Sequence, residues 1–149
     1  MPTMTELAGL HVVFDSADPD RVSKFWMTAL PGYDFPQPPP EGFETWEQWA
    51  DANSIPLDQR NQARTLVDTV GNRPTIFFNQ VSESKSGKNR LHLDIKVAEG
   101  LSGDQRRTRI EFETDRLLAA GAEIVKRVDD GDGFWTVMRD VEGNEFCVI

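Results

Sequence analysis

The sequence contains a single cysteine, Cys147, among 149 residues. One cysteine excludes an internal disulfide framework and is typical of a protein in a reducing cytoplasm. No apolar run approaches the ~20 residues that a membrane-spanning helix needs. Met1 to Glu6 lack the basic region and apolar stretch of a secretory signal. The sequence therefore predicts a cytoplasmic protein with no membrane partner.

Positive charge is also scarce. Lys and Arg number 16 against 25 Asp and Glu, which gives a formal charge of −9. Nucleic-acid backbones and anionic membranes are recognised mainly by clustered Lys and Arg, and here the basic residues are scattered. We therefore expect neither partner. Hydrophobic residues make up 38% of the chain and charged residues 28%, a normal mixture for one globular domain.

Patterns typical of strands and helices occur in the same order twice. The first half has a strand at 10–14, a helix at about 18–30, and strands at 64–70 and 75–81; the second half has a strand at 91–97, a helix at about 105–120, and strands at 124–128, 134–138 and 145–149. The proline-rich residues 36–40 open an insertion, 36–62, in the first copy. The repeated order of a strand, a helix and then further strands predicts an internal duplication.

The first strand of each copy carries one of the only two histidines, His11 and His92. Side chains alternate across a strand, so His92 and Asp94 share a polar face opposite the apolar residues. By the same rule Glu145 and Cys147 share a face. Such a polar face can simply meet solvent. The equivalent positions of the two histidines favour the other interpretation, a common cleft.

Three segments resemble a known family: GLHVVFDSADPDRVSKFW, KNRLHLDIKV and the final stretch from Leu117 to Ile149. Taken in this order, they resemble the glyoxalase/bleomycin-resistance/dioxygenase proteins, which form the vicinal oxygen chelate superfamily. Within it, the resemblance is strongest to the glyoxalase-like branch. The last segment includes the family's turn, which here reads Asp140-Val141-Glu142-Gly143-Asn144, with Val in the usual place of Pro.

The resemblance implies an α+β fold of two βαβββ modules, whose curled mixed sheets enclose a cleft. It implies a single domain over 1–149, with module one at about 7–81 and module two at about 90–149. Relatives commonly pair, so a homodimer is expected.

Metal-bearing members of the family hold one divalent ion in the cleft. The family's ligand positions fall on His11 and His92, near Asn79, and on Cys147, where the usual ligand is Glu. Glu145 lies two residues before Cys147 on the same face and is the carboxylate that could replace it. The resemblance thus implies His11, His92, Glu145 and Cys147 as candidate ligands for Zn, Ni, Fe or Mn. The missing carboxylate favours a metal-free form.

Two functions remain open from the sequence. The first is a binding protein that holds a small organic molecule in the cleft; drug sequestration of the bleomycin type, with a cationic ligand, would suit the acidic charge. The second is a metal-dependent lyase or isomerase of glyoxalase type, with Glu145 as the catalytic carboxylate. In either case the candidate substrate-binding residues are Phe77, Asn79, Asp94, Trp135 and Trp46. Cys147 could instead be a small buried apolar residue, and Trp46 could pack against the sheet.

Overall fold

The computed structural model of the chain describes residues 8–131 and 133–149. The residues Met1 to Glu6, for which the sequence gives an expectation, lie outside the described residues. The described chain divides into two compact units. The first includes the residues up to Ser23 and Gly32–Val81, and the second includes Lys24–Pro31 and Ser82–Ile149. Among the described residues, no helix is long and apolar enough to cross a membrane.

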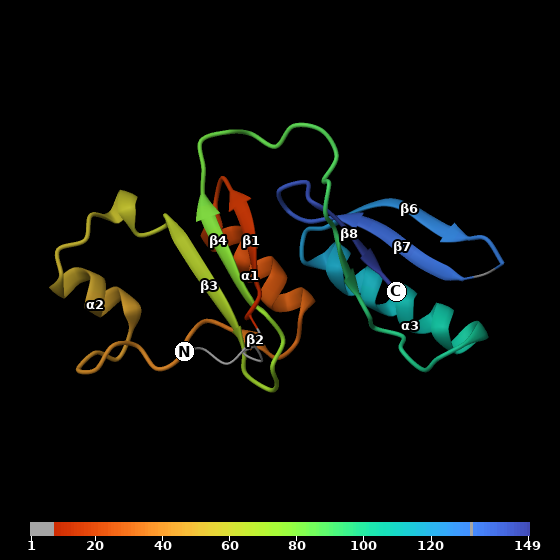
Figure 1. Ribbon diagram of the computed structural model, residues 1–149, viewed down its shortest axis with the longest axis horizontal. Helices are drawn as coiled ribbons and strands as arrows, with labels where there is room; N and C mark the ends of the chain where they lie inside the picture. The colour runs from red at the N-terminus through yellow and green to blue at the C-terminus, as the bar shows by residue number, and fades with distance from the viewer. Residues whose placement is uncertain (1–7, 132) are drawn as a thin grey trace. The chain divides into compact units, whose positions relative to one another are not determined.

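The first unit contains a four-stranded sheet in the order β1-β4-β3-β2 (Figure 1). The strands are β1 (His11–Ser16), β2 (Tyr33–Asp34), β3 (Ala63–Asp68) and β4 (Thr75–Gln80). β1 pairs with β4 in parallel, and the other neighbours are antiparallel. The insertion contains the short helix α2 (Trp46–Ala52) and the 3₁₀ turn η1 (Leu57–Gln59).

The second unit repeats this arrangement. Its strands are β5 (Leu93–Ile95), β6 (Glu123–Asp129), β7 (Phe134–Arg139) and β8 (Glu145–Val148), and their order is β5-β8-β7-β6. β5 pairs with β8 in parallel, while β6, β7 and β8 are antiparallel. The connection from β5 to β6 contains helix α3 (Gly103–Ala119). In each sheet the first strand therefore lies beside the last, which confirms the predicted duplicated α+β fold.

The strands β2 and β5 differ most from the sequence-based prediction. β2 is only two residues long and was not predicted, because a two-residue strand has no alternation to detect. β5 is also shorter than the predicted strand at 91–97, so that His92 lies just before its first residue.

Helix α1 (Pro19–Ala29) begins as predicted, since the carboxylate of Asp18 accepts a hydrogen bond from the N–H of Arg21 at 3.2 Å.

The core of the first unit lies on one face of its sheet. Leu66, Ile76 and Phe78 are buried there, and the ring of Phe14 stacks on that of Phe78 with centroids 5.2 Å apart. Burying such side chains stabilises the fold by about 1.5–3 kcal/mol each. The opposite face carries His11 and the residues that share its parity.

In the second unit, helix α3 buries one stripe against β7 and β8. Ile110, Thr114 and Leu117 are buried, and the hydroxyl groups of Thr114 and Thr136 lie 3.1 Å apart in a hydrogen bond. The helix ends at Ala119, and Gly121 follows shortly after with a φ of 106°, which is strained for any residue with a side chain. A Cβ at Gly121 would also lie 3.0 Å from Val141. This glycine therefore allows the close approach of the helix end to the turn before β8.

That turn is organised by the carboxylate of Asp140, which is 3% exposed. It accepts hydrogen bonds from the indole N–H of Trp26 at 2.9 Å, from the backbone N–H groups of Glu142 and Asn144, and from the Asn144 side chain. The ring of Trp26 in turn packs edge-on against Phe146 of β8, with centroids 5.1 Å apart. Asp140 thus joins α1 to the turn from which β8 begins.

We predict that Asp140→Ala lowers the free energy of unfolding by about 2–4 kcal/mol, because it leaves buried N–H donors without an acceptor. Urea unfolding followed by circular dichroism measures the change. The control is Asp115→Ala, which removes an exposed carboxylate from α3 and should change stability by no more than ~0.5 kcal/mol. Equal stability of the two variants would contradict this role for Asp140.

Candidate functional site

The second sheet has one apolar face and one polar face, as strand alternation requires. Phe146 and Val148 are buried on the apolar side. On the polar side, Asp94 of β5 lies beside Cys147 of β8, and Cys147 lies beside Val137 of β7. One pair further along, Glu145 lies beside Arg139. The chemically reactive side chains of this unit are therefore gathered on one surface of the sheet.

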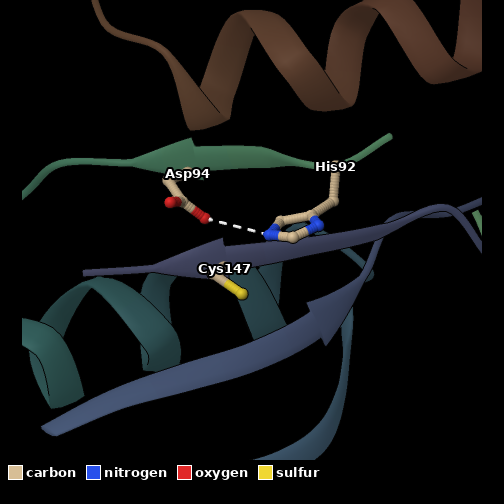
Figure 2. A group of neighbouring side chains, drawn as sticks. All are labelled: His92, Asp94 and Cys147. Carbon is tan, nitrogen blue, oxygen red and sulfur yellow. Dashed lines mark ion pairs between the residues drawn. The ribbon is translucent and has the colours of Figure 1, made fainter. Parts of the chain in front are cut away.

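Three of these side chains form a compact group: His92, Asp94 and Cys147 (Figure 2). The imidazole Nε2 of His92 lies 3.4 Å from a carboxylate oxygen of Asp94, and both side chains are about half exposed. Cys147 is half-buried on the neighbouring strand β8. One ligand atom from each residue lies within 4.8 Å of the others.

The thiol of Cys147 is held in its neutral form. Burial raises the pKa of the Cys147 thiol, and the negative charge and hydrogen bond of Asp94 raise it further. The positive charges of Lys88 and Lys126 act in the opposite direction, but they do not outweigh the first two effects. At neutral pH the residue is therefore a thiol, so that binding of a metal through its sulfur has to displace a proton.

Glu145 is directed to other partners. Its carboxylate accepts a hydrogen bond from the backbone N–H of Asn89 at 3.0 Å, and lies 3.5 Å from the amino group of Lys85 and 3.9 Å from the Arg139 guanidinium. Burial tends to raise the pKa of Glu145, but the Asn89 hydrogen bond and the charge of Lys85 outweigh it, and the pKa is below its usual value. Glu145 is thus an ionised carboxylate with cationic neighbours.

A groove with a volume of about 510 Å³ lies next to Glu145. It is lined by Lys85, Gly87, Lys88, Val125, Lys126, Val137, Arg139 and Glu145. Of these lining residues, only Glu145 is a candidate site residue from the sequence. Alternation along β6 and β7 indicates which side chains share a face. However, the register that brings Lys126 beside Val137 includes a shift between Ile124 and Lys126. Such a bulge is not visible in the sequence.

In the first unit, the parallel register of β1 and β4 determines which predicted residues are neighbours. His11 lies beside Thr75, and Phe77 lies beside Val13. Asn79 lies beside Asp15, four positions further along the strand than His11, or about 13 Å at the usual rise per residue. His11, Phe77 and Asn79 share one face, but the register separates His11 from Asn79. The roles predicted for them stay predictions.

The two predicted tryptophans lie in different units. Trp46 begins helix α2 in the first unit; its ring packs edge-on against that of Trp49 with centroids 5.8 Å apart, and its indole N–H donates to the backbone oxygen of Pro36. It is 44% exposed, so the pair covers only part of the ring. Trp135 is half-buried on β7, on the same face as Val137. The roles of these two residues in substrate binding also stay predictions.

The donor chemistry of His92, Asp94 and Cys147 suits a borderline cation such as Zn²⁺, which takes nitrogen, oxygen and sulfur ligands. Metal–ligand bonds of about 2.0–2.3 Å place two ligand atoms of one ion no more than ~4.6 Å apart. The three atoms lie within 4.8 Å of one another, so small side-chain rotations would bring them into range. The group therefore fits such an ion, and the ligand roles predicted for His11 and Glu145 stay predictions.

Comparisons with known proteins agree on the fold. A family model described as "Glyoxalase-like domain" matches residues 11–149. A search of curated proteins found no match. Among solved structures, the chain is similar to a glyoxalase/bleomycin resistance protein/dioxygenase family enzyme from Burkholderia phytofirmans PsJN, with 19% identity, a TM-score of 0.60, and coverage of 95% of this chain and 97% of that one.

The chain is also similar to two fosfomycin resistance proteins named FosX. The protein from Mesorhizobium loti has 12% identity and a TM-score of 0.59, with coverage of 98% of this chain and 91% of that one. A mutant of the Listeria monocytogenes protein, complexed with Mn(II) and 1S,2S-dihydroxypropylphosphonic acid, has 12% identity and a TM-score of 0.60, with coverage of 96% and 90%. At these identities the likeness concerns the fold alone.

The charges around Cys147 predict opposite effects of two substitutions on its pKa. Asp94→Asn should lower the pKa, because it removes the neighbouring negative charge, whereas Lys126→Gln should raise it. Alkylation of the single cysteine with iodoacetamide over a series of pH values measures the midpoint directly, since only the thiolate reacts. Midpoints that move in the same direction in the two variants would contradict this account of the site.

Proposed function

This chain belongs to the family of glyoxalase-like domains, and from that premise we propose that it binds a small organic molecule. The observation that carries the proposal is the groove on the polar face of the second sheet. Its volume of about 510 Å³ lies within the ~300–1,000 Å³ typical of small-molecule sites. We propose that this groove provides at least part of the binding surface.

The lining of the groove supports this proposal. Val125 and Val137 offer apolar contact, and Lys85, Lys126 and Arg139 offer hydrogen-bond donors on side chains that differ in length. The sequence predicts a ligand between the two modules, with a contribution from His11 and the first sheet. That contribution, the homodimer and the cytoplasmic location remain predictions.

A thermal-shift screen with a library of small organic compounds tests the proposal. A ligand at a concentration of about 100 times its Kd should stabilise the folded protein by about 2.7 kcal/mol and raise Tm. The variant Val137→Trp fills the groove with a bulky ring without adding a charge and should abolish the shift. The control Val70→Trp makes the same change at an exposed valine of the first unit and should leave the shift unchanged. Hits that are unaffected by Val137→Trp would place binding elsewhere.

A second candidate function, a metal-dependent lyase or isomerase, is favoured by the group of His92, Asp94 and Cys147. The FosX protein complexed with Mn(II) is a structural neighbour whose bound metal suggests the same use of the fold. A divalent ion held by these residues would supply Lewis-acid polarisation of a substrate oxygen. On the same face, the ionised carboxylate of Glu145 would accept a proton in exchange for its contacts with Asn89 and Lys85.

Titration of the metal-free protein with Zn²⁺, Ni²⁺, Fe²⁺ and Mn²⁺ distinguishes the two candidates. The metal-dependent function predicts binding that is lost in His92→Ala, because this change removes one of three ligands. The metal-free function predicts no measurable binding by the wild type and a gain in Cys147→Glu, which introduces a carboxylate beside Asp94. Isothermal calorimetry provides the measurement.

The variant His11→Ala separates two possible ligand sets in the same titration. If the ion is held as the family pattern implies, His11→Ala abolishes binding together with His92→Ala. If it is held by His92, Asp94 and Cys147, then Asp94→Ala abolishes binding and His11→Ala leaves it unchanged. Binding that survives both His92→Ala and Asp94→Ala would exclude this group as the metal site.

A further inference from the structure

The groove of the second unit has a charge opposite to that of the whole chain. The chain has a formal charge of −9. The groove, by contrast, is lined by four cationic side chains and one carboxylate: Lys85, Lys88, Lys126, Arg139 and Glu145. These cations come from the β6–β7 hairpin and from a loop that is distant from it in sequence, so the fold and not a local basic run brings them together. A net charge alone therefore misleads about the ligand that this surface attracts.

The single carboxylate of the groove neutralises only part of this charge. Glu145 is 12% exposed and lies 3.5 Å from Lys85 and 3.9 Å from Arg139. Lys88 and Lys126 have no ion pair among the described parts of the chain, and both are exposed. They are consequently available to bind an anionic group from outside the protein.

Two valines, Val125 and Val137, give part of the groove an apolar lining. Val137 of β7 lies beside Lys126 in the register of β6 and β7, and the shift between Ile124 and Lys126 makes Val125 the extra residue of a bulge. The bulge explains why two consecutive residues, Val125 and Lys126, line the same groove. Val125 is 39% exposed, so its side chain is open to contact. The site thus combines cationic edges with a small apolar surface.

We propose that the ligand of this groove is a small organic anion, with a carboxylate, phosphate or phosphonate group bound by Lys88 and Lys126 and an apolar part over Val125 and Val137. This inference rests on the proposed function, because it names the chemical class of the molecule that the protein binds. It replaces the expectation, drawn from the net charge, of a cationic ligand. Glu145, held by Lys85 and Arg139, excludes a second anionic group from that end of the groove.

Calorimetric titration with three probes of similar size tests the inference: phenyl phosphate, benzyl alcohol and benzyltrimethylammonium. Phenyl phosphate should bind, and the neutral and cationic probes should not. Lys126→Gln should weaken the binding about tenfold, which corresponds to the loss of one charge-assisted contact of about 1.4 kcal/mol. Lys88→Gln should have a similar effect. Higher salt should weaken binding further, since the Debye length falls from about 10 Å at 0.1 M to about 3 Å at 1 M.

Arg127→Gln is the matched control. Arg127 is the next residue of β6, carries the same charge, and turns to the opposite face, where its guanidinium lies 2.8 Å from Glu111 of α3. This variant should bind phenyl phosphate within about twofold of the wild type, because an exposed ion pair contributes little. Equal loss in Arg127→Gln and Lys126→Gln would show a nonspecific effect of net charge and overturn the proposal.

The remaining outcomes separate this inference from the proposed function. Binding of benzyltrimethylammonium or benzyl alcohol in preference to phenyl phosphate, abolished by Val137→Trp, would keep the groove as a ligand site and refute its anion preference. No binding of phenyl phosphate, together with thermal-shift hits that are all neutral or cationic, would also refute the anion preference alone. The absence of any hit in the screen would refute the proposed function itself.

Discussion

The buried carboxylate of Asp140 is the interaction on which the candidate site depends most. It holds the indole N–H of Trp26 and two backbone amides of the turn that leads into β8. β8 carries Glu145 and Cys147, and its position fixes both neighbours, β5 on one side and β7 on the other. The family turn is therefore more than a sequence signature, because its aspartate sets where the functional strand of the second sheet begins.

The position of β8, together with strand alternation, determines which of its side chains lie on the polar face. Phe146 and Val148 face the helices, so Glu145 and Cys147 must face the other way. The bulge in β6 adds Val125 and Lys126 to the same surface. Two distinct sets of groups result on one polar face: the imidazole, carboxylate and thiol of His92, Asp94 and Cys147, and the cationic groove around Glu145.

The fold could be predicted from the sequence because its order of elements is repeated, and because turns such as Gly121 and Asp140 have strong local signals. The pairing of Asp94 with Cys147 was less accessible, since parity gives the face of a residue but not its neighbour on the next strand. For the same reason, parity places His11 and Asn79 on one face but does not show that the register keeps them apart. The cationic groove could not be predicted, because it depends on a bulge and on a loop that meets the sheet only in the folded chain.

The two sets of groups on this face favour ligands of opposite charge. His92, Asp94 and Cys147 suit a metal cation, whereas the groove suits an organic anion. Lys88 and Lys126 lie close enough to Cys147 to act on the pKa of its thiol. The same positive charges repel a divalent cation at His92, Asp94 and Cys147, while they attract an organic anion. A metal ion and an anion are compatible here only if the anion coordinates the ion and so neutralises part of its charge. Without such an anion, electrostatics favours the groove as a metal-free binding surface, and the neutral thiol of Cys147 acts in the same direction.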